Sequence, residues 1–251
     1  MIHPSGIIPQ FDKENHKYLI DGKELLSVTQ LIGKFFPKFK RDEISKIYAK
    51  KHGLTQEHVL AMWEDKRVRT KTIGDNCHLF ASNFIDYLYG VENKKIIKPY
   101  NIRYGIVVDK IIELKEAGVL YPEHKIFSLK FNIAGTVDIV SINNHIVYLY
   151  DWKFVETIDI NNPWENCNAP INYLSASKFN KFALQLNLYQ FILETEGYFE
   201  NKYFESQDRN IVYKKALLHV TDTDCIKIDV PDMKKEVKAI IIEREKLNGK
   251  K

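Results

Sequence analysis

The apolar and polar positions of this chain change their period along its length. Two stretches rich in Ile, Val, Tyr and Leu, residues 133–140 and 146–153, have the composition of β-strands. Between them, Asn143 and Asn144 tolerate the positive φ of a tight hairpin turn. Gly135, inside the first strand, marks a bulge or a close approach of another group. The pattern therefore predicts an antiparallel hairpin at the centre of the fold.

This hairpin brings charged groups to one face. If Asn143 and Asn144 form a two-residue loop, Asp138 pairs with Leu149, and Asp151 is its diagonal neighbour. Diagonal neighbours lie about 7–8 Å apart, a gap that two carboxylate side chains can close around a metal ion. Lys153 shares this face, while the Trp152 side chain points to the other face and leaves its carbonyl beside the ion.

Helical and strand periods continue through the rest of the chain. Helices are expected over 27–32, 41–51, 55–67, 72–89, 101–117, 182–193 and 231–247, and further strands over 17–20, 24–26, 121–131, 211–221 and 225–230. The polar, turn-rich segment 156–181 is a candidate active-site loop. These elements predict an α/β fold, with a mixed sheet core flanked by helices and a helical N-terminal portion. The expected division of this one compact domain is 1–71, a hairpin and basic helical portion, and 72–251, the core.

Carboxylates and a lysine on adjacent strands suit phosphodiester hydrolysis. Hard carboxylate oxygens favour Mg²⁺ or Mn²⁺, and such an ion activates a bound water and offsets charge on the phosphate. Lys153 can orient or deprotonate that water. An Asp-x-Lys string is short, however. An equally good interpretation is that Asp138 and Asp151 are charges at strand ends and that Lys153 is their solvated partner.

Four further residues strengthen the catalytic reading. His78 lies near the start of a helical pattern, and Glu123 precedes the first strand of the hairpin. Gln185 and Tyr189 are four residues apart, so they share one face of a mostly buried helix. Taken singly, each of the four is as readily a core or surface residue.

In their order along the chain, these residues resemble a known family. His78, Glu123, Gly135-x-x-Asp138, Asp151-x-Lys153 and Gln185-x-x-x-Tyr189 resemble the PD-(D/E)xK nuclease superfamily. Within it, the set is similar to the RecB-type branch, which includes the nuclease domains of RecB and AddAB and phage and mitochondrial exonucleases. The resemblance covers roughly residues 72–191. It departs from the pattern at Leu79, where many relatives have an acid.

The resemblance implies a restriction-endonuclease-like core and a role for each residue of the set. The implied metal ligands are Asp138, Asp151 and the Trp152 carbonyl, with His78 approaching the same ion. Lys153 is implied to be catalytic and Glu123 an accessory acid. Gln185 and Tyr189 are implied to support the site or to contact DNA.

Charge distribution adds a candidate surface for nucleic acid. The net charge is only +4, but residues 34–71 carry eleven Lys or Arg against five Asp or Glu. Aromatic residues are interleaved among them, as in grooves that bind phosphates with cations and bases with flat rings. A solvated helix surface over core aromatics is the alternative reading. The candidate DNA contacts are Lys38, Lys40, Arg41, Lys66, Arg67, Arg69 and Lys71, together with Gln185 and Tyr189.

Other sequence features bear on cofactors, cellular location and partner chains. The three cysteines, Cys77, Cys167 and Cys225, are scattered and predict neither a disulfide framework nor a zinc or iron–sulfur centre. Neither a signal peptide nor a membrane-spanning run is evident, so a bacterial or phage-infected host cytoplasm is expected. A phosphate-binding loop of helicases is also lacking, so any helicase or recombination partner is expected on another chain.

The sequence thus predicts a Mg²⁺- or Mn²⁺-dependent deoxyribonuclease. The expected activity is that of an exonuclease on single-stranded DNA or DNA ends, in recombination, repair or phage DNA processing. Two alternatives stay open: an endonuclease of the same superfamily, and a DNA-binding module whose nuclease site is vestigial.

Overall fold

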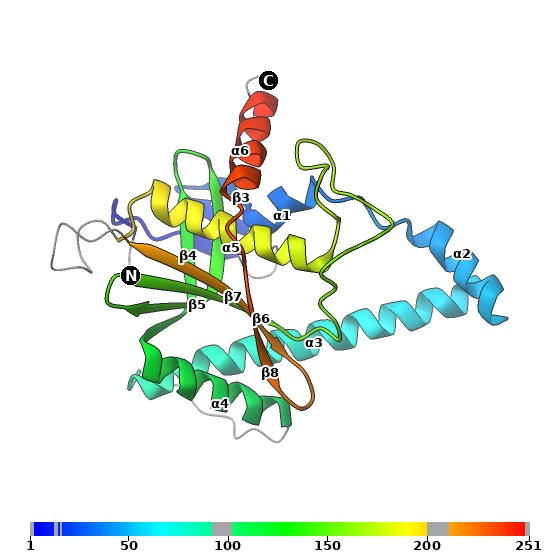
Figure 1. Cartoon of the computed structure of the whole chain (residues 1–251), viewed down its shortest axis with the longest axis horizontal. Helices are drawn as coiled ribbons and strands as arrows, with labels where there is room; N and C mark the ends of the chain where they lie inside the picture. The colour runs from blue at the N-terminus through cyan, green and yellow to red at the C-terminus, as the bar shows by residue number, and fades with distance from the viewer. Residues whose placement is uncertain (1–2, 13–14, 16, 92–101, 200–210, 249–251) are drawn as a thin grey trace.

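A computed structural model describes residues 3–12, 15, 17–91, 102–199 and 211–248. An eight-stranded mixed sheet is flanked by helices, which confirms the expected α/β class (Figure 1). The strands are β1 (Gln10–Asp12), β2 (Lys17–Ile20), β3 (Lys23–Ser27), β4 (Val119–Ser128), β5 (Ile133–Asn143), β6 (Ile146–Lys153), β7 (Val212–Val220) and β8 (Cys225–Asp229). The helices are α1 (Val28–Gly33), α2 (Arg41–His52), α3 (Gln56–Leu88), α4 (Ile102–Ala117), α5 (Lys178–Thr195) and α6 (Lys234–Asn248).

The sheet contains a break that positions the site. Its order is β1-β2-β3-β5-β6-β7-β8, and β4 runs along the whole of one edge of β5. On its other edge β5 changes partner, pairing in parallel with β3 through Ile133 and Ala134 and antiparallel with β6 from Ile139 onward. Gly135 and Asp138 lie in the stretch between these partners.

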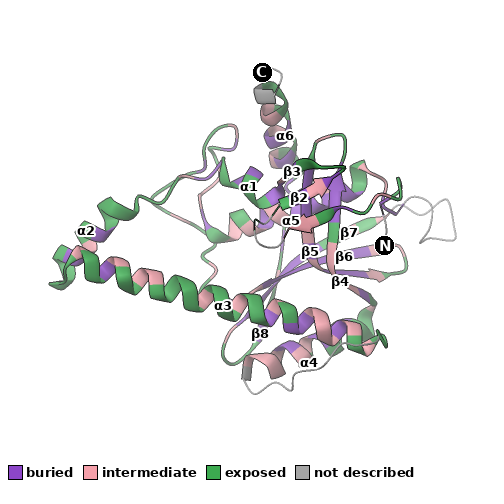
Figure 2. Cartoon of the chain, turned by 180° about the vertical axis from the view of Figure 1, so that it is seen from behind, coloured by how far each residue is buried: buried purple, intermediate pink, exposed green. Residues whose placement is uncertain are grey.

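Helices cover both faces of the sheet. On one face, α1, α5 and α6 pack Leu31, Leu184 and Ile240 into the same buried cluster as Leu149 of β6. On the other, α4 and the C-terminal half of α3 pack with Trp152 of β6 and with β7. Figure 2 shows the buried residues gathered on the sheet and on the inner sides of these helices. Within the described ranges, every helix is too short or too polar to traverse a lipid bilayer.

One long helix replaces two expected ones. Thr55 caps α3 as predicted, accepting a hydrogen bond from the His58 N–H, but the helix runs without interruption to Leu88. Residues 68–71 contain neither Gly nor Pro, so nothing ends the helix there. The expected division at 71/72 therefore falls inside α3. Its N-terminal half buries only Val59 and projects from the sheet with α2 (Figure 1).

The predicted register of the hairpin was wrong by two residues. Leu149 pairs with Val140, not with Asp138, and the turn consists of Asn144 and His145. Asn144 adopts the positive φ of 50°. Asn143 remains in the strand, because its side-chain amide donates to the Ala117 carbonyl at 2.6 Å. A shift of two residues by itself leaves each side chain on the same face of the sheet.

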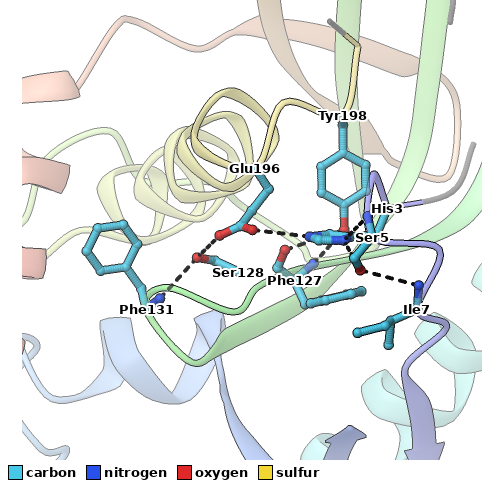
Figure 3. Close-up of polar contacts among 8 residues, drawn as sticks. All are labelled: His3, Ser5, Ile7, Phe127, Ser128, Phe131, Glu196 and Tyr198. Atoms are coloured by element: carbon cyan, nitrogen blue, oxygen red, sulfur yellow. Dashed lines mark hydrogen bonds and ion pairs between the residues drawn. The ribbon is translucent and has the colours of Figure 1, made fainter. Parts of the chain in front are cut away.

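A cluster of polar contacts links the segment around His3 to the sheet (Figure 3). The His3 ring stacks on Phe127 with centroids 4.1 Å apart, and its Nδ1 lies 2.6 Å from Ser5 Oγ. His3 Nε2 lies 3.2 Å from Glu196 Oε2, while Ser128 Oγ donates to the other oxygen of Glu196 at 2.5 Å. The cluster thus joins the N-terminal segment, β4 and the residues that follow α5.

Candidate active site

Three carboxylates form a row across β4, β5 and β6. Continuing the register of β4 with β5 places Glu123 opposite Asp138. Continuing the pair of Ile139 with Tyr150 places Asp138 opposite Asp151. The charges of three neighbouring strands therefore meet where β5 changes partner.

The backbone is irregular at this row. Glu123 has a φ of 44°, a left-handed conformation that costs about 1–3 kcal/mol in a residue with a side chain. Neither Glu123 nor Asp138 belongs to the ladder that continues on both sides of them. Around Asp138 the facing of β5 also changes phase, because Val137 and Val140 pack with the α5 cluster while Ile139 packs with the α3 and α4 cluster. Distortions of this kind change the direction of side chains, and here they turn Asp138 toward α3.

His78 of α3 completes a candidate metal centre with two of these carboxylates. Its Nδ1 lies 3.4 Å from Asp138 Oδ2 and 3.8 Å from Glu123 Oε1. One potential ligand atom from each of the three residues lies within 4.8 Å of the others. Two carboxylates and one imidazole, all half-buried, are donors of the kind that bind divalent ions in proteins.

Asp151 and Lys153 form a buried ion pair beside that centre. Asp151 is only 2% exposed; its Oδ1 accepts from the Gln185 amide at 3.3 Å, and its Oδ2 pairs with Lys153 Nζ. Lys153 Nζ also lies 4.3 Å from the centre of the Phe182 ring. Asp151 is not part of that three-residue group, and Lys153 and Gln185 both contact its oxygens. The pair places an amine at the edge of the candidate centre.

The backbone of Trp152 faces the centre. Its N–H donates to Asp138 Oδ2 at 2.7 Å, which fixes the orientation of that carboxylate. In a strand, the N–H and C=O of one residue point to the same neighbour, so the Trp152 carbonyl also faces β5. The indole ring is buried with the α3 and α4 cluster, on the predicted opposite face.

Gln185 and Tyr189 support the site from beneath. As predicted, they share a face of α5, where the Gln185 amide donates to Tyr189 Oη at 2.8 Å. A Cβ added to Gly135 would lie 2.4 Å from Tyr189 Cε1, so the predicted close approach is confirmed. Of the two roles expected for Tyr189, support of the site or contact with DNA, its burial fits support: the side chain is 3% exposed. Gln185 is half-buried and holds Asp151 instead of facing outward.

The buried charges perturb one another. Burial raises the pKa of Asp138. Burial likewise raises the pKa of Asp151 to about 6, against the opposing effect of Lys153. For His78, burial lowers the pKa, but the carboxylates of Asp138 and Glu123 outweigh it and bring the pKa to about 9. The protein without metal therefore holds a proton in this centre at neutral pH.

This charge arrangement predicts a pH-dependent stability of the metal-free protein. Because the pKa of His78 is raised from 6.5 to about 9 on folding, its stabilising contribution is complete below pH 6.5 and lost as pH rises through 9. We expect the stability advantage of the wild type over His78→Gln, measured by urea unfolding in EDTA, to shrink over that window. An advantage that stays constant, or an NMR titration of His78 near 6.5, would contradict this.

The seven basic candidate DNA contacts lie on the projecting part of the chain. Lys38 and Lys40 precede α2, Arg41 begins α2, and the remaining four lie on α3. Several are in surface ion pairs: Lys40 with Glu43, Arg41 and Arg67 with Glu64, Lys66 with Glu156, and Arg69 with Asp65. Exposed pairs of this kind are worth about 0–1 kcal/mol, so a polyanion can displace them.

Three contacts of the site were missed by the sequence analysis. Phe154 packs edge-on against the His78 ring, with centroids 5.4 Å apart, and Phe182 underlies Lys153. Tyr18 hydrogen-bonds Thr136 of β5 at 2.9 Å, close to the carboxylate row. Phe182 lies in the segment that was read as the helix with Gln185, but nothing in its spacing indicates a contact with Lys153.

Comparison with known proteins does not assign this chain to a family. The chain matches none of the protein-family models, and no curated protein matches it.

Proposed function

We propose that this protein is a Mg²⁺- or Mn²⁺-dependent deoxyribonuclease, as the resemblance to PD-(D/E)xK nucleases of the RecB type implies. The observation that carries the proposal is the row Glu123, Asp138 and Asp151 across three strands, with His78 above it and Lys153 beside it. Sequence order alone does not require these residues to meet, yet the fold brings all five to one break in the sheet.

In this proposal, His78, Glu123 and Asp138 would hold the divalent ion, and Asp151 and the Trp152 carbonyl would complete its ligands. The donor set fits, since hard oxygens outnumber the single imidazole. When bound, such an ion makes a water more acidic and offsets negative charge on the phosphate.

The remaining residues prepare the site for hydrolysis. Lys153 orients the attacking water or takes its proton, and then stabilises the negative charge that develops on the phosphate oxygens. The Trp152 N–H holds Asp138, and Gln185 holds Asp151, so neither carboxylate must reorient during the reaction. Phe182 lies against one side of the Lys153 amine.

An exonuclease on single strands or DNA ends is the form of the activity that we propose. The basic, aromatic projection of α2 and α3 supports it, because such surfaces suit single-stranded DNA. The proposed setting is a bacterial or phage-infected cytoplasm, which suits the three unpaired, buried cysteines.

Cleavage of end-labelled linear single-stranded DNA beside a closed circular single strand tests the proposal. With Mg²⁺ or Mn²⁺ we expect loss of the linear strand only, and with EDTA no loss of either. Because the donor set includes an imidazole, we expect Mn²⁺ to support at least as much activity as Mg²⁺. Cutting of the circle would favour an endonuclease, and DNA binding without cleavage in either metal would favour a vestigial site.

A further inference from the structure

A cleft lies between the start of α2 and the exposed half of α3, away from the carboxylate row. It has a volume of about 650 Å³. Its apolar lining comes from Phe39 and Trp63, whose ring centroids are 5.7 Å apart and whose planes are tilted by 54°. Phe39 is 65% exposed, an unusual exposure for a ring of this size. The cleft thus presents an exposed aromatic ring to solvent.

Cations surround this aromatic face. The lining includes Arg41, Lys66, Arg67 and Lys71 and one acid, Glu64. Glu64 pairs with two guanidinium groups, those of Arg67 at 2.5 Å and Arg41 at 3.6 Å, so the positive charge remains in excess. An aromatic floor with a cationic rim matches a nucleobase and its flanking phosphates, whereas an apolar protein segment would leave the excess positive charge uncompensated.

The cleft and the carboxylate site lie on the same side of α3. Lys71 and Arg67 precede His78 by seven and eleven residues, which are close to two and three whole helical turns. Trp63 precedes His78 by fifteen residues, or about 22 Å along the helix axis at 1.5 Å per residue. A strand with stacked bases advances about 3.4 Å per nucleotide, so about six or seven nucleotides cover this distance.

We propose that this cleft binds a nucleobase of single-stranded DNA, against Phe39 and Trp63, about six or seven nucleotides from the bond that is cut. The inference rests on the proposed nuclease function and specifies its substrate as a single strand that follows α3. The cations hold the phosphates between cleft and site, and the ring contact tolerates any base because every base has a flat face.

Binding without cleavage tests the cleft separately from the nuclease activity. Fluorescence anisotropy in EDTA compares a labelled dT12 with an abasic strand of the same length, for the wild type and for Phe39→Leu/Trp63→Leu. We expect the wild type to prefer dT12 by about fivefold or more, and the double variant to lose that preference. Tyr87→Leu, at the other end of α3 and 52% exposed, is the matched control and should bind as the wild type does.

The outcomes separate the two proposals. Equal binding of dT12 by the double variant and the wild type, or no binding by the wild type, overturns the cleft as a base site and leaves the cleavage assay to judge the nuclease. Loss of the dT12 preference in a variant with unchanged circular dichroism supports the cleft even if no cleavage is found. If cleavage is found, wild-type rates should rise steeply between strands of about four and eight nucleotides, and the double variant should show a flatter dependence.

Discussion

Lys153→Ala is expected to reduce DNA cleavage by about 10²–10⁴-fold, because a positioned amine that moves a proton or stabilises developing charge contributes that much. Lys153 is the amine paired with Asp151 at the edge of the candidate metal centre. Initial rates on labelled single-stranded DNA, at saturating Mg²⁺ or Mn²⁺, measure the effect. Cleavage at the wild-type rate would overturn the catalytic role.

The matched control is Lys214→Ala. Lys214 is also a strand lysine beside an aromatic ring, 5.6 Å from the centre of Tyr148, but it lies on β7, away from the carboxylate row. Its removal should leave the rate unchanged. Loss of Lys153 leaves the buried Asp151 without its cation, so the pKa of Asp151 should rise further and the residue should take up a proton. Urea unfolding of Lys153→Ala distinguishes lost catalysis from lost structure.

Asp138→Asn provides a second route to the same conclusion. The amide has nearly the shape of the carboxylate and can still accept the Trp152 N–H, but it removes one negative charge from the candidate centre. We expect weaker metal binding, visible by calorimetry with Mn²⁺, together with lost cleavage. Unchanged Mn²⁺ affinity would show that the ion binds away from Asp138.

Local patterns were sufficient to predict much of this site. Alternation along 146–153 indicated that Asp151 and Lys153 share a face, and they form an ion pair. The two-residue error in register did not change this, because side chains alternate with period two. Spacing of i, i+4 predicted the contact between Gln185 and Tyr189. These features depend on nearest neighbours in sequence, which periodicity describes well.

The parts that escaped prediction depend on distant contacts. Glu123 reaches the centre through a left-handed backbone conformation that no residue preference indicates for glutamate. His78 approaches from a helix whose continuity across residues 68–71 was not expected, and Tyr18 meets Thr136 across 118 residues of sequence. Such contacts form when the helices and the sheet pack together, and no pattern of neighbouring residues in the sequence indicates them.

Gly135→Ala is expected to damage both stability and activity. The new methyl group would lie 2.4 Å from Tyr189 Cε1, and the Tyr189 ring is buried in the core. Overpacking of this kind costs about 1–3 kcal/mol in the free energy of unfolding. Cleavage should fall as well, because a displaced Tyr189 pulls on Gln185, which holds Asp151.

A double-mutant cycle shows whether the ring contact causes the loss. Tyr189→Leu removes the ring, so Gly135→Ala should cost less stability in that background, with a coupling of about 0.5–3 kcal/mol in urea unfolding. Gly105→Ala in α4 is the control, since a Cβ there meets nothing within 4 Å and should stabilise the helix by about 0.5–1 kcal/mol. Additive effects of Gly135→Ala and Tyr189→Leu would mean that Gly135 is needed for its backbone rather than for the approach of Tyr189. In that case Gln185 would hold Asp151 without help from the packing of Tyr189 against Gly135.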